Sequence, residues 1–350
     1  MPASRVRGES DLEAGVPSVV TAAERPTLSV SVTIPAYTME RWELLCESVE
    51  SVRAQTVAAE QVVVCIDNNE ELLRRAEREW ADCSDPAVVV IPNRHSEHLD
   101  HLAAHGLAHG TSRRFGAGPA RSAAAELVHS DVIAFIDDDA RAEPDWLAQL
   151  LSVFESPSIV AVGGAPLPVY ETGRPRWYPD NFDWVFGCAY QGLPSSAAPL
   201  RHLIGANLAV RRYAWEAVGG FMDSDFDDLD LCLRLAQRFG SESLYYAPDA
   251  VVHHFVPAER VTWRYFYRRC YFVNRGKVKV FRSLGGAANL MAEREFVLRA
   301  LTTQVGEYLR RAAKGQPDAL RQLAAMMAGI ALAVLGHVRG RMDRVTQRDA

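Results

Sequence analysis

The stretch Val132–Asp139, VIAFIDDD, joins a short apolar run to three adjacent carboxylates. Its first part, Val132–Ile136, is β-branched and aromatic and too short for a helix, which predicts a buried strand. The acidic residues then lie at the edge of a sheet, where open α/β folds bind ligands. Three neighbouring negative charges repel one another unless a cation or hydrogen-bond donors lie among them. Because Mg²⁺ binds carboxylates together with phosphate oxygens, the stretch suggests a metal–diphosphate site, with a solvated acidic turn as the alternative.

Strands and helices alternate on both sides of this stretch. The predicted strands are 28–34, 62–66, 88–91, 132–136, 159–164 and 251–254, and the predicted helices are 40–55, 70–80, 118–129, 146–154, 226–239 and much of 292–340. This alternation predicts an α/β fold with a mostly parallel central sheet and helices on both faces. Residues 165–200, rich in proline and aromatic side chains, predict a long functional loop.

Composition limits the classes of protein that fit. A net charge of −6 over 350 residues gives no general attraction to nucleic acid. The six cysteines contain no Cys-x-x-Cys pair, which favours free thiols in a reducing compartment. The first residues show no basic start followed by an apolar core, so we expect no signal peptide and a cytoplasmic protein.

The chain is expected to have three parts. Residues 1–26 are polar and predict a disordered tail. The main domain is predicted at 27–258, divided into halves at 27–145 and 146–258, and a helical extension at 259–350 follows. That extension holds a basic and aromatic stretch at 260–282 and an apolar one at 323–338. The apolar stretch is short for a membrane span and predicts a packed helix, with contact to the inner face of the cell membrane as the alternative.

Several short motifs occur in a characteristic order. They are SVTIPAY at 31–37, VCID at 64–67, GPARS at 118–122, FIDDD at 135–139, GAN at 205–207, GGF at 219–221 and DDLDL at 227–231. Each motif alone is weak, but their order and spacing resemble family 2 glycosyltransferases of the GT-A fold, across roughly residues 28–282. The resemblance implies a Rossmann-like sheet that binds a nucleotide-sugar donor.

The resemblance assigns the donor site first. It implies that Pro35, Ala36, Tyr37 and Asp67 hold the nucleobase and ribose. A turn or a helix cap is the alternative role for Asp67. The family usually has a second acid after that position, whereas this chain has Asn68 and Asn69, so the base stays open.

The diphosphate and metal residues follow. Arg121 is expected to hold phosphate oxygens with its planar guanidinium. The resemblance implies that Asp137 faces the ribose, that Asp138 assists, and that Asp139 binds a divalent metal, Mn²⁺ or Mg²⁺. It also implies that His254 completes the metal site. Its neighbour, His253, is the alternative ligand, and a purely structural role is the alternative for His254.

The proton-accepting residue is expected at a helix start. The resemblance implies that Asp228 is the general base for an attacking hydroxyl, and Asp227 replaces the glutamate usual before it. The alternative is that these acids only cap the helix. Trp177 and Asn207, with Asp227, are the expected acceptor-binding residues, and packing beneath a loop is an equal alternative for Trp177.

One segment is not part of the family resemblance. Half of the ten histidines lie in a short stretch, at His95, His98, His101, His105 and His109. If helical, they share one face, and His101 and His105 have the spacing of helical zinc ligands. A polar helix face or loop is the favoured interpretation, with a metal site or a lid over the donor as the alternatives.

Together these features predict an inverting, metal-dependent glycosyltransferase. It is expected to move a sugar from a nucleotide-diphosphate donor to a hydroxyl of a lipid-linked or cell-envelope glycan, with no nucleic-acid partner. One alternative is a GT-A module that binds glycans or acts as a scaffold without turnover. The other is a nucleotidyltransferase, although residues 28–41 lack a glycine-rich basic phosphate loop.

Overall fold

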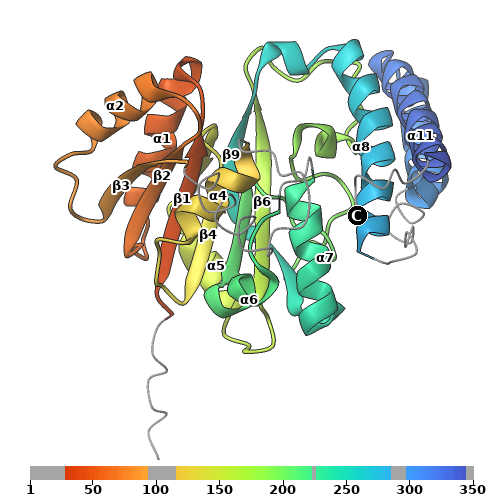
Figure 1. The fold of residues 1–350 in the computed structure, drawn as a ribbon. Coiled ribbons are helices and arrows are strands. Elements are labelled where there is room, and N and C mark those ends of the chain that lie inside the picture. The colour runs from red at the N-terminus through yellow and green to blue at the C-terminus, as the bar shows by residue number, and fades with distance from the viewer. Residues whose placement is uncertain (1–27, 94–115, 223–225, 285–296, 344–350) are drawn as a thin grey trace, which may run out of the picture.

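A sheet of nine strands lies at the centre of the described structure, with helices on both faces (Figure 1). The computed structural model describes residues 28–93, 116–222, 226–284 and 297–343. The strands are β1 (Val30–Ala36), β2 (Gln61–Ile66), β3 (Ala87–Pro92), β4 (Val132–Ile136), β5 (Ala140–Ala142), β6 (Ala161–Tyr170), β7 (Ala198–Pro199), β8 (Asn207–Arg211) and β9 (Leu244–Val256). The α-helices are α1 (Trp42–Arg53), α2 (Glu70–Glu79), α4 (Ala117–Ala125), α5 (Trp146–Val153), α6 (Arg212–Val218), α7 (Asp227–Phe239), α8 (Trp263–Ser283), α10 (Val305–Ala313) and α11 (Asp318–Met342).

The strand order explains how the site forms. Neighbours follow the order β3-β2-β1-β4-β8-β6-β9-β5, and β7 pairs with β9. β3, β2, β1 and β4 are parallel, β8 runs against both of its neighbours, and β6 and β9 are parallel. The predicted α/β fold with a mostly parallel central sheet is confirmed. Because β1, β2 and β4 are parallel, the residues after them, Tyr37, Asp67 and Asp137, emerge at one edge.

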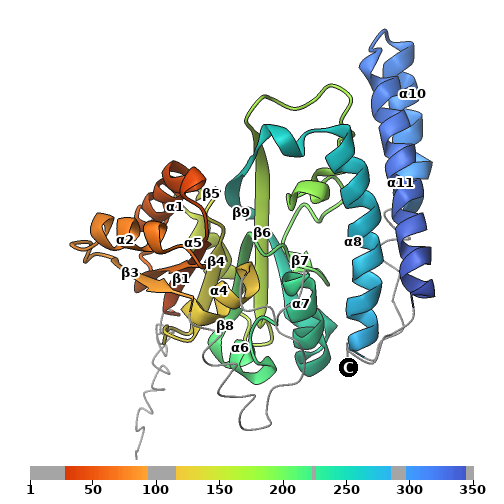
Figure 2. The same cartoon turned by 45° about the horizontal axis from the view of Figure 1, so that its top comes forward.

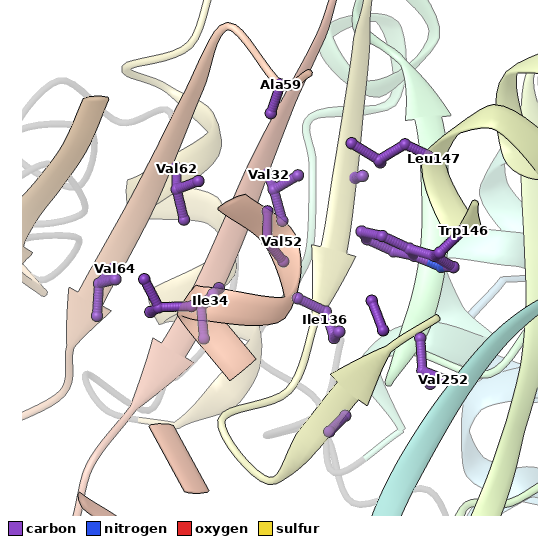
Figure 3. Close-up of a cluster of buried hydrophobic side chains, with 14 of the residues drawn as sticks. Val32, Ile34, Val52, Ala59, Val62, Val64, Ile136, Trp146, Leu147 and Val252 are labelled. Atoms are coloured by element: carbon purple, nitrogen blue, oxygen red, sulfur yellow. The ribbon is translucent and has the colours of Figure 1, made fainter. Parts of the chain in front are cut away.

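The main core lies between the sheet and helices α1 and α5 (Figure 3). Val32, Ile34 and Ile136 point from β1 and β4 toward Val52 of α1 and Trp146 of α5, and all five are buried. The alternate residues Ile133 and Phe135 of β4 pack on the opposite face with Ala120 and Ala124 of α4. This alternation follows from the two-residue period of a strand, and covering both faces requires the nearly continuous apolar runs of the sequence.

The prediction of a long loop at 165–200 is partly wrong. β6 continues to Tyr170 because it pairs with β9 as far as Val256. Farther along the segment, the side chains of Tyr178 and Phe182 are fully buried. Aromatic residues of this otherwise irregular segment therefore form part of the core.

A third hydrophobic cluster joins this segment to the C-terminal helices. Phe266 of α8 lies with its ring centre 5.4 Å from that of Tyr178 and 5.2 Å from that of Phe182. Met326 and Ile330 of α11 belong to the same cluster. Both cartoon views show α11 beside α8, on the far side of α8 from the sheet (Figures 1 and 2).

Helix α11 carries the apolar stretch 323–338 and packs against α8 through glycines. A Cβ atom on Gly336 would lie 2.2 Å from the carbonyl oxygen of Tyr271, so the two backbones approach closely. The outward side chains Val334, Leu335 and Val338 are about half exposed. In the described ranges, α11 alone is long and apolar enough to cross a membrane, by length and composition, and 39% of its most apolar window is buried.

We predict that Gly336→Val loosens the contact between α8 and α11. The added side chain meets backbone that has no room to move, and overpacking of this kind costs about 1–3 kcal/mol. Urea unfolding of the variant measures the lost free energy of unfolding. The matched control is Val334→Ala on the exposed face of the same helix, expected to change stability by less than about 0.5 kcal/mol. Equal stabilities of the two variants would contradict the close packing.

Candidate active site

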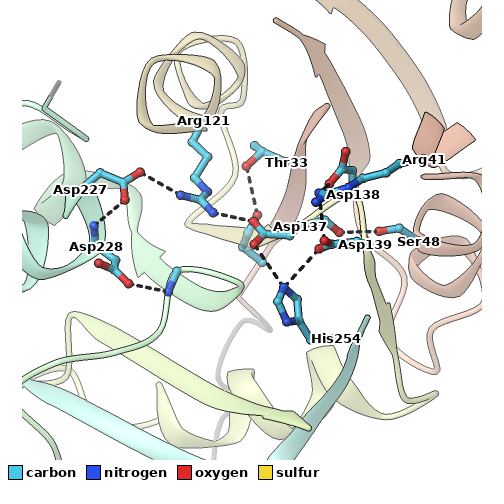
Figure 4. Close-up of polar contacts among 12 residues, drawn as sticks. Thr33, Arg41, Ser48, Arg121, Asp137, Asp138, Asp139, Asp227, Asp228 and His254 are labelled. Atoms are coloured by element: carbon cyan, nitrogen blue, oxygen red, sulfur yellow. Dashed lines mark hydrogen bonds and ion pairs between the residues drawn. The ribbon is translucent and has the colours of Figure 1, made fainter. Parts of the chain in front are cut away.

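The acidic run Asp137–Asp139 lies in the turn between β4 and β5, where the parallel strands end (Figure 4). Asp138 and Asp139 are each only 4% exposed, so the alternative of a solvated acidic turn is wrong for these two residues. Ser48 of α1 donates a hydrogen bond to the Asp137 carbonyl oxygen at 3.1 Å. The first helix thereby fixes the backbone of the turn.

Asp137, Asp139 and His254 together offer ligands for a metal ion. One ligand atom from each lies within 4.8 Å of the others. The Nε2 atom of His254 is 3.2 Å from Asp139 Oδ1 and 3.9 Å from Asp137 Oδ2, and its Nδ1 faces the Cys188 sulfur at 3.4 Å. Two carboxylates and an imidazole suit a divalent cation such as Mn²⁺. Asp137, expected only to face the ribose, joins the two predicted ligands.

The alternative ligand, His253, points away from this cluster. Successive residues of a strand face opposite sides, and the His253 ring pairs with Glu143 instead. Of the two neighbouring histidines, the geometry therefore favours His254.

Arg41 was not singled out by the sequence, yet it lies among these acids. It ends the 3₁₀ turn Met39–Arg41, and its Nη1 is 2.9 Å from Asp139 Oδ2 and 3.0 Å from Asp138 Oδ1. Burial and the adjoining Asp139 raise the pKa of Asp138 to about 7, although Arg41 opposes the shift. Burial also disfavours charge on Asp139, but hydrogen bonding to His254 and the charge of Arg41 hold the pKa of Asp139 below its ordinary value.

The predicted diphosphate residue, Arg121, bridges two acidic groups. Its Nη2 donates to Asp137 Oδ1 at 2.5 Å and its Nη1 to Asp227 Oδ2 at 2.9 Å, and only 5% of the residue is exposed. Burial disfavours the cation, but both carboxylates raise the pKa of Arg121, so it stays charged. Its Nε atom is buried and has no hydrogen-bond partner among the described residues. Arg121 thus connects the metal-type cluster to the start of α7.

The predicted base, Asp228, lies at that helix start. Its Oδ2 accepts a hydrogen bond from the Gly205 backbone at 3.2 Å and lies 3.4 Å from His202 Nε2, and its Oδ1 accepts from the Leu229 backbone at 2.7 Å. Burial opposes charge here, yet His202 and these backbone donors hold the pKa of Asp228 below its ordinary value. In Asp227, burial raises the pKa to about 6 against the pull of Arg121. The neighbouring carboxylates therefore differ: Asp228 is held ionised and Asp227 is easier to protonate.

The predicted nucleobase residues meet at the same sheet edge. Asp67 accepts hydrogen bonds from Asn93 Nδ2 at 2.7 Å and the Gly116 backbone at 2.8 Å, while the Tyr37 side chain is 54% exposed. Pro35 and Ala36 form the end of β1.

Asn69 stands at the N-cap of α2. It accepts from the Leu72 backbone at 3.0 Å and donates to the Tyr37 carbonyl oxygen at 3.0 Å. Asn69, where the chain departs from the family pattern, therefore connects the start of α2 to the residue after β1.

Two of the predicted acceptor residues, Asn207 and Trp177, lie in different parts of the structure. Asn207 is fully buried, with Oδ1 accepting from Trp146 Nε1 at 2.8 Å and Nδ2 donating to the Ala250 carbonyl oxygen at 2.8 Å. Its amide is thus engaged inside the core, which favours a structural role over the expected acceptor contact. Trp177 stacks on Trp263, with ring centres 3.7 Å apart, in the aromatic cluster. The predicted histidine segment, 95–109, lies outside the described residues.

Solved structures define the class of this fold. A mannosyltransferase, PcManGT from Pyrobaculum calidifontis, solved with GDP-Man and Mn²⁺, aligns with a TM-score of 0.55 at 18% identity, over 88% of this chain and 87% of that one. GalNAc-T7, solved with UDP, GalNAc and Mn²⁺, aligns with a TM-score of 0.50 at 16% identity, over 78% of this chain and 54% of that one. The fold is the GT-A fold of such glycosyltransferases.

Sequence comparison then identifies the family. The family model described as Glycosyltransferase like family 2 matches residues 26–270, and the chain belongs to this family. A glucosyl-dolichyl phosphate glucuronosyltransferase of Haloferax volcanii is 32% identical over 237 residues, which are 65% of this chain and 69% of the relative. The predicted glycosyltransferase is confirmed, and membership disfavours both the nucleotidyltransferase and the module without turnover.

We predict that His254→Ala weakens Mn²⁺ binding at least about tenfold, the scale on which changes around a metal site act. The matched control is His253→Ala, which removes the neighbouring imidazole on the opposite face of β9 and should leave the affinity unchanged. Isothermal titration of Mn²⁺ into each variant measures the difference. Equal loss in both variants, or in neither, would contradict a metal site that includes His254.

Proposed function

We propose that the protein is an inverting, divalent-metal-dependent glycosyltransferase that moves a sugar from a nucleotide-diphosphate donor to a hydroxyl of a lipid-linked sugar. The observation that carries the proposal is the buried charge cluster, in which Arg121 connects Asp137 of the metal-type group to Asp227, next to the proposed base. One cluster therefore offers groups for both the departing and the attacking side of a displacement.

The donor side is built from the sheet edge. Asp137, Asp139 and His254 would hold the metal, which when bound neutralises the charge that develops on the departing diphosphate. Arg121 keeps one buried Nε–H without a partner among the described residues, which is free to donate to a phosphate oxygen. Asp67 and the exposed Tyr37 ring lie at the same edge and fit contacts to ribose and base.

The acceptor side uses Asp228. Its depressed pKa keeps the carboxylate ionised and able to accept the proton as the acceptor oxygen attacks the anomeric carbon. The bond from that carbon to the diphosphate oxygen breaks as the new glycosidic bond forms. A single displacement of this kind inverts the anomeric configuration.

Two observations support a lipid-linked acceptor at a membrane surface. The relative from Haloferax volcanii is named for action on a glucosyl-dolichyl phosphate. In addition, α11 presents Leu335 and Val338 outward beside Arg339 and Arg341, a combination suited to a lipid headgroup boundary. We therefore propose that the enzyme works at the inner face of the cell membrane.

The experiment offers UDP-glucuronate first, then UDP- and GDP-linked hexoses, with a short-chain glucosyl polyprenyl phosphate and Mn²⁺. We predict that Asp228→Asn lowers kcat about 10²- to 10⁴-fold, the usual contribution of a general base, with little change in donor KM. Released nucleoside diphosphate and product mass measure turnover. Asp249→Asn, an exposed acid of β9, is the control. Transfer by Asp228→Asn at the wild-type rate, or transfer that persists in EDTA, would refute the mechanism.

Membrane contact has its own test. We predict that the wild-type protein floats with anionic liposomes and that Leu335→Gln with Val338→Gln reduces the bound fraction about tenfold, since burying one apolar side chain is worth about 1.5–3 kcal/mol. The control is Leu127→Gln, an exposed leucine just after α4. Failure of the wild-type protein to float, or equal flotation of all variants, would contradict a membrane-surface enzyme.

A further inference from the structure

His202 lies against the proposed base without belonging to any motif discussed above. It stands in the segment between β7 and β8, and its Nε2 is 3.4 Å from Asp228 Oδ2. That nitrogen is buried and makes no well-aligned hydrogen bond in the described part of the chain, although 35% of the side chain is exposed. Leaving a buried N–H donor without a hydrogen bond costs free energy. The nearby acceptor for this nitrogen is the Asp228 carboxylate oxygen.

The segment that carries His202 is fitted closely around Asp228. The Gly205 backbone donates to the same Oδ2 atom at 3.2 Å. A Cβ atom on Gly205 would lie 3.2 Å from the Asp228 Cβ and 3.4 Å from Arg121 Nη1, so the backbone here passes close to both residues. The Gly205 N–H and the His202 ring nitrogen, both from one short segment, therefore face the same oxygen of the proposed base.

The two oxygens of Asp228 are consequently unequal. Oδ2 faces both the Gly205 N–H and His202, whereas Oδ1 accepts only from the Leu229 backbone among the described residues. A carboxylate oxygen has two lone pairs. The pair that stays free for a substrate proton is thus on Oδ1.

We propose that His202 is a positioning residue for Asp228: its Nε2–H holds Oδ2 and leaves Oδ1 to take the proton of the acceptor hydroxyl. This inference rests on the proposed role of Asp228 as base. In the step itself, the acceptor O–H bond breaks and an O–H bond forms at Oδ1, while the acceptor oxygen bonds to the anomeric carbon and the diphosphate departs with its bonding electrons. His202 keeps its own proton throughout.

The test compares two replacements of similar size, one that keeps an N–H donor and one that lacks it. With the donor and acceptor that the panel above selects and saturating Mn²⁺, His202→Leu is expected to lower kcat about tenfold or more, because small displacements of a catalytic group cost up to about 10²-fold. Donor KM should stay unchanged, and His202→Gln should recover most of the rate. His129→Ala, an exposed histidine away from the site, is the control.

A double variant separates this inference from the proposed function. If His202 acts through Asp228, adding His202→Leu to Asp228→Asn should cost little further rate, since residues that act as one unit are not additive. Full activity of Asp228→Asn would instead refute the base itself. A slow Asp228→Asn enzyme together with a normal His202→Leu enzyme would overturn only the role of His202.

Two more results would also overturn it. One is an equal loss of kcat in His202→Leu and His202→Gln, which would show that the N–H donor is irrelevant. The other is a multiplied loss in the double variant, which would show independent action. Thermal unfolding of every variant shows whether a loss of kcat comes from misfolding. If His202→Leu does not fold, the kcat of His202→Gln is compared with that of the wild-type enzyme.

Discussion

A buried guanidinium between carboxylates of distant segments is the interaction on which this structure depends. Arg121 of α4 holds Asp137 at the end of β4 and Asp227 at the start of α7, and it is almost completely shielded from water. Removing one partner of a buried ion pair typically costs about 3–5 kcal/mol, because the other charge is left uncompensated. The sheet edge and helix α7 are therefore fixed relative to each other by charge as well as by apolar packing.

This constraint gives the site two connected halves. On one side, Asp137, Asp139 and His254 gather ligand atoms for a divalent cation, and Arg41 neutralises part of the remaining charge. On the other side, Asp228 is kept ionised by the donors around it. A displacement at an anomeric carbon needs both a stabilised leaving group and a proton acceptor, and family 2 membership agrees with that chemistry.

The sequence predicts much of the fold and the places of its acidic residues, because those signals are local. The apolar run before Asp137 marked a buried strand, and the acids at 227–230 marked a helix start, as the structure confirms. Arg41 escaped prediction because its partner Asp138 lies 97 positions away. The contacts of Asn207 are hidden from the sequence for the same reason, because only the tertiary fold brings Trp146 and Ala250 to its amide. The burial of Tyr178 and Phe182 is hidden from the sequence as well, because it depends on packing against the distant helices α8 and α11.

The stereochemistry of the product tests the central claim most directly. Proton NMR of the glycoside formed during the first turnovers reports the anomeric configuration through its coupling constant. A single displacement assisted by Asp228 predicts a configuration opposite to that of the nucleotide-sugar donor. A product that retains the donor configuration would contradict the account, because it would require a second displacement for which the proposed site assigns no nucleophile.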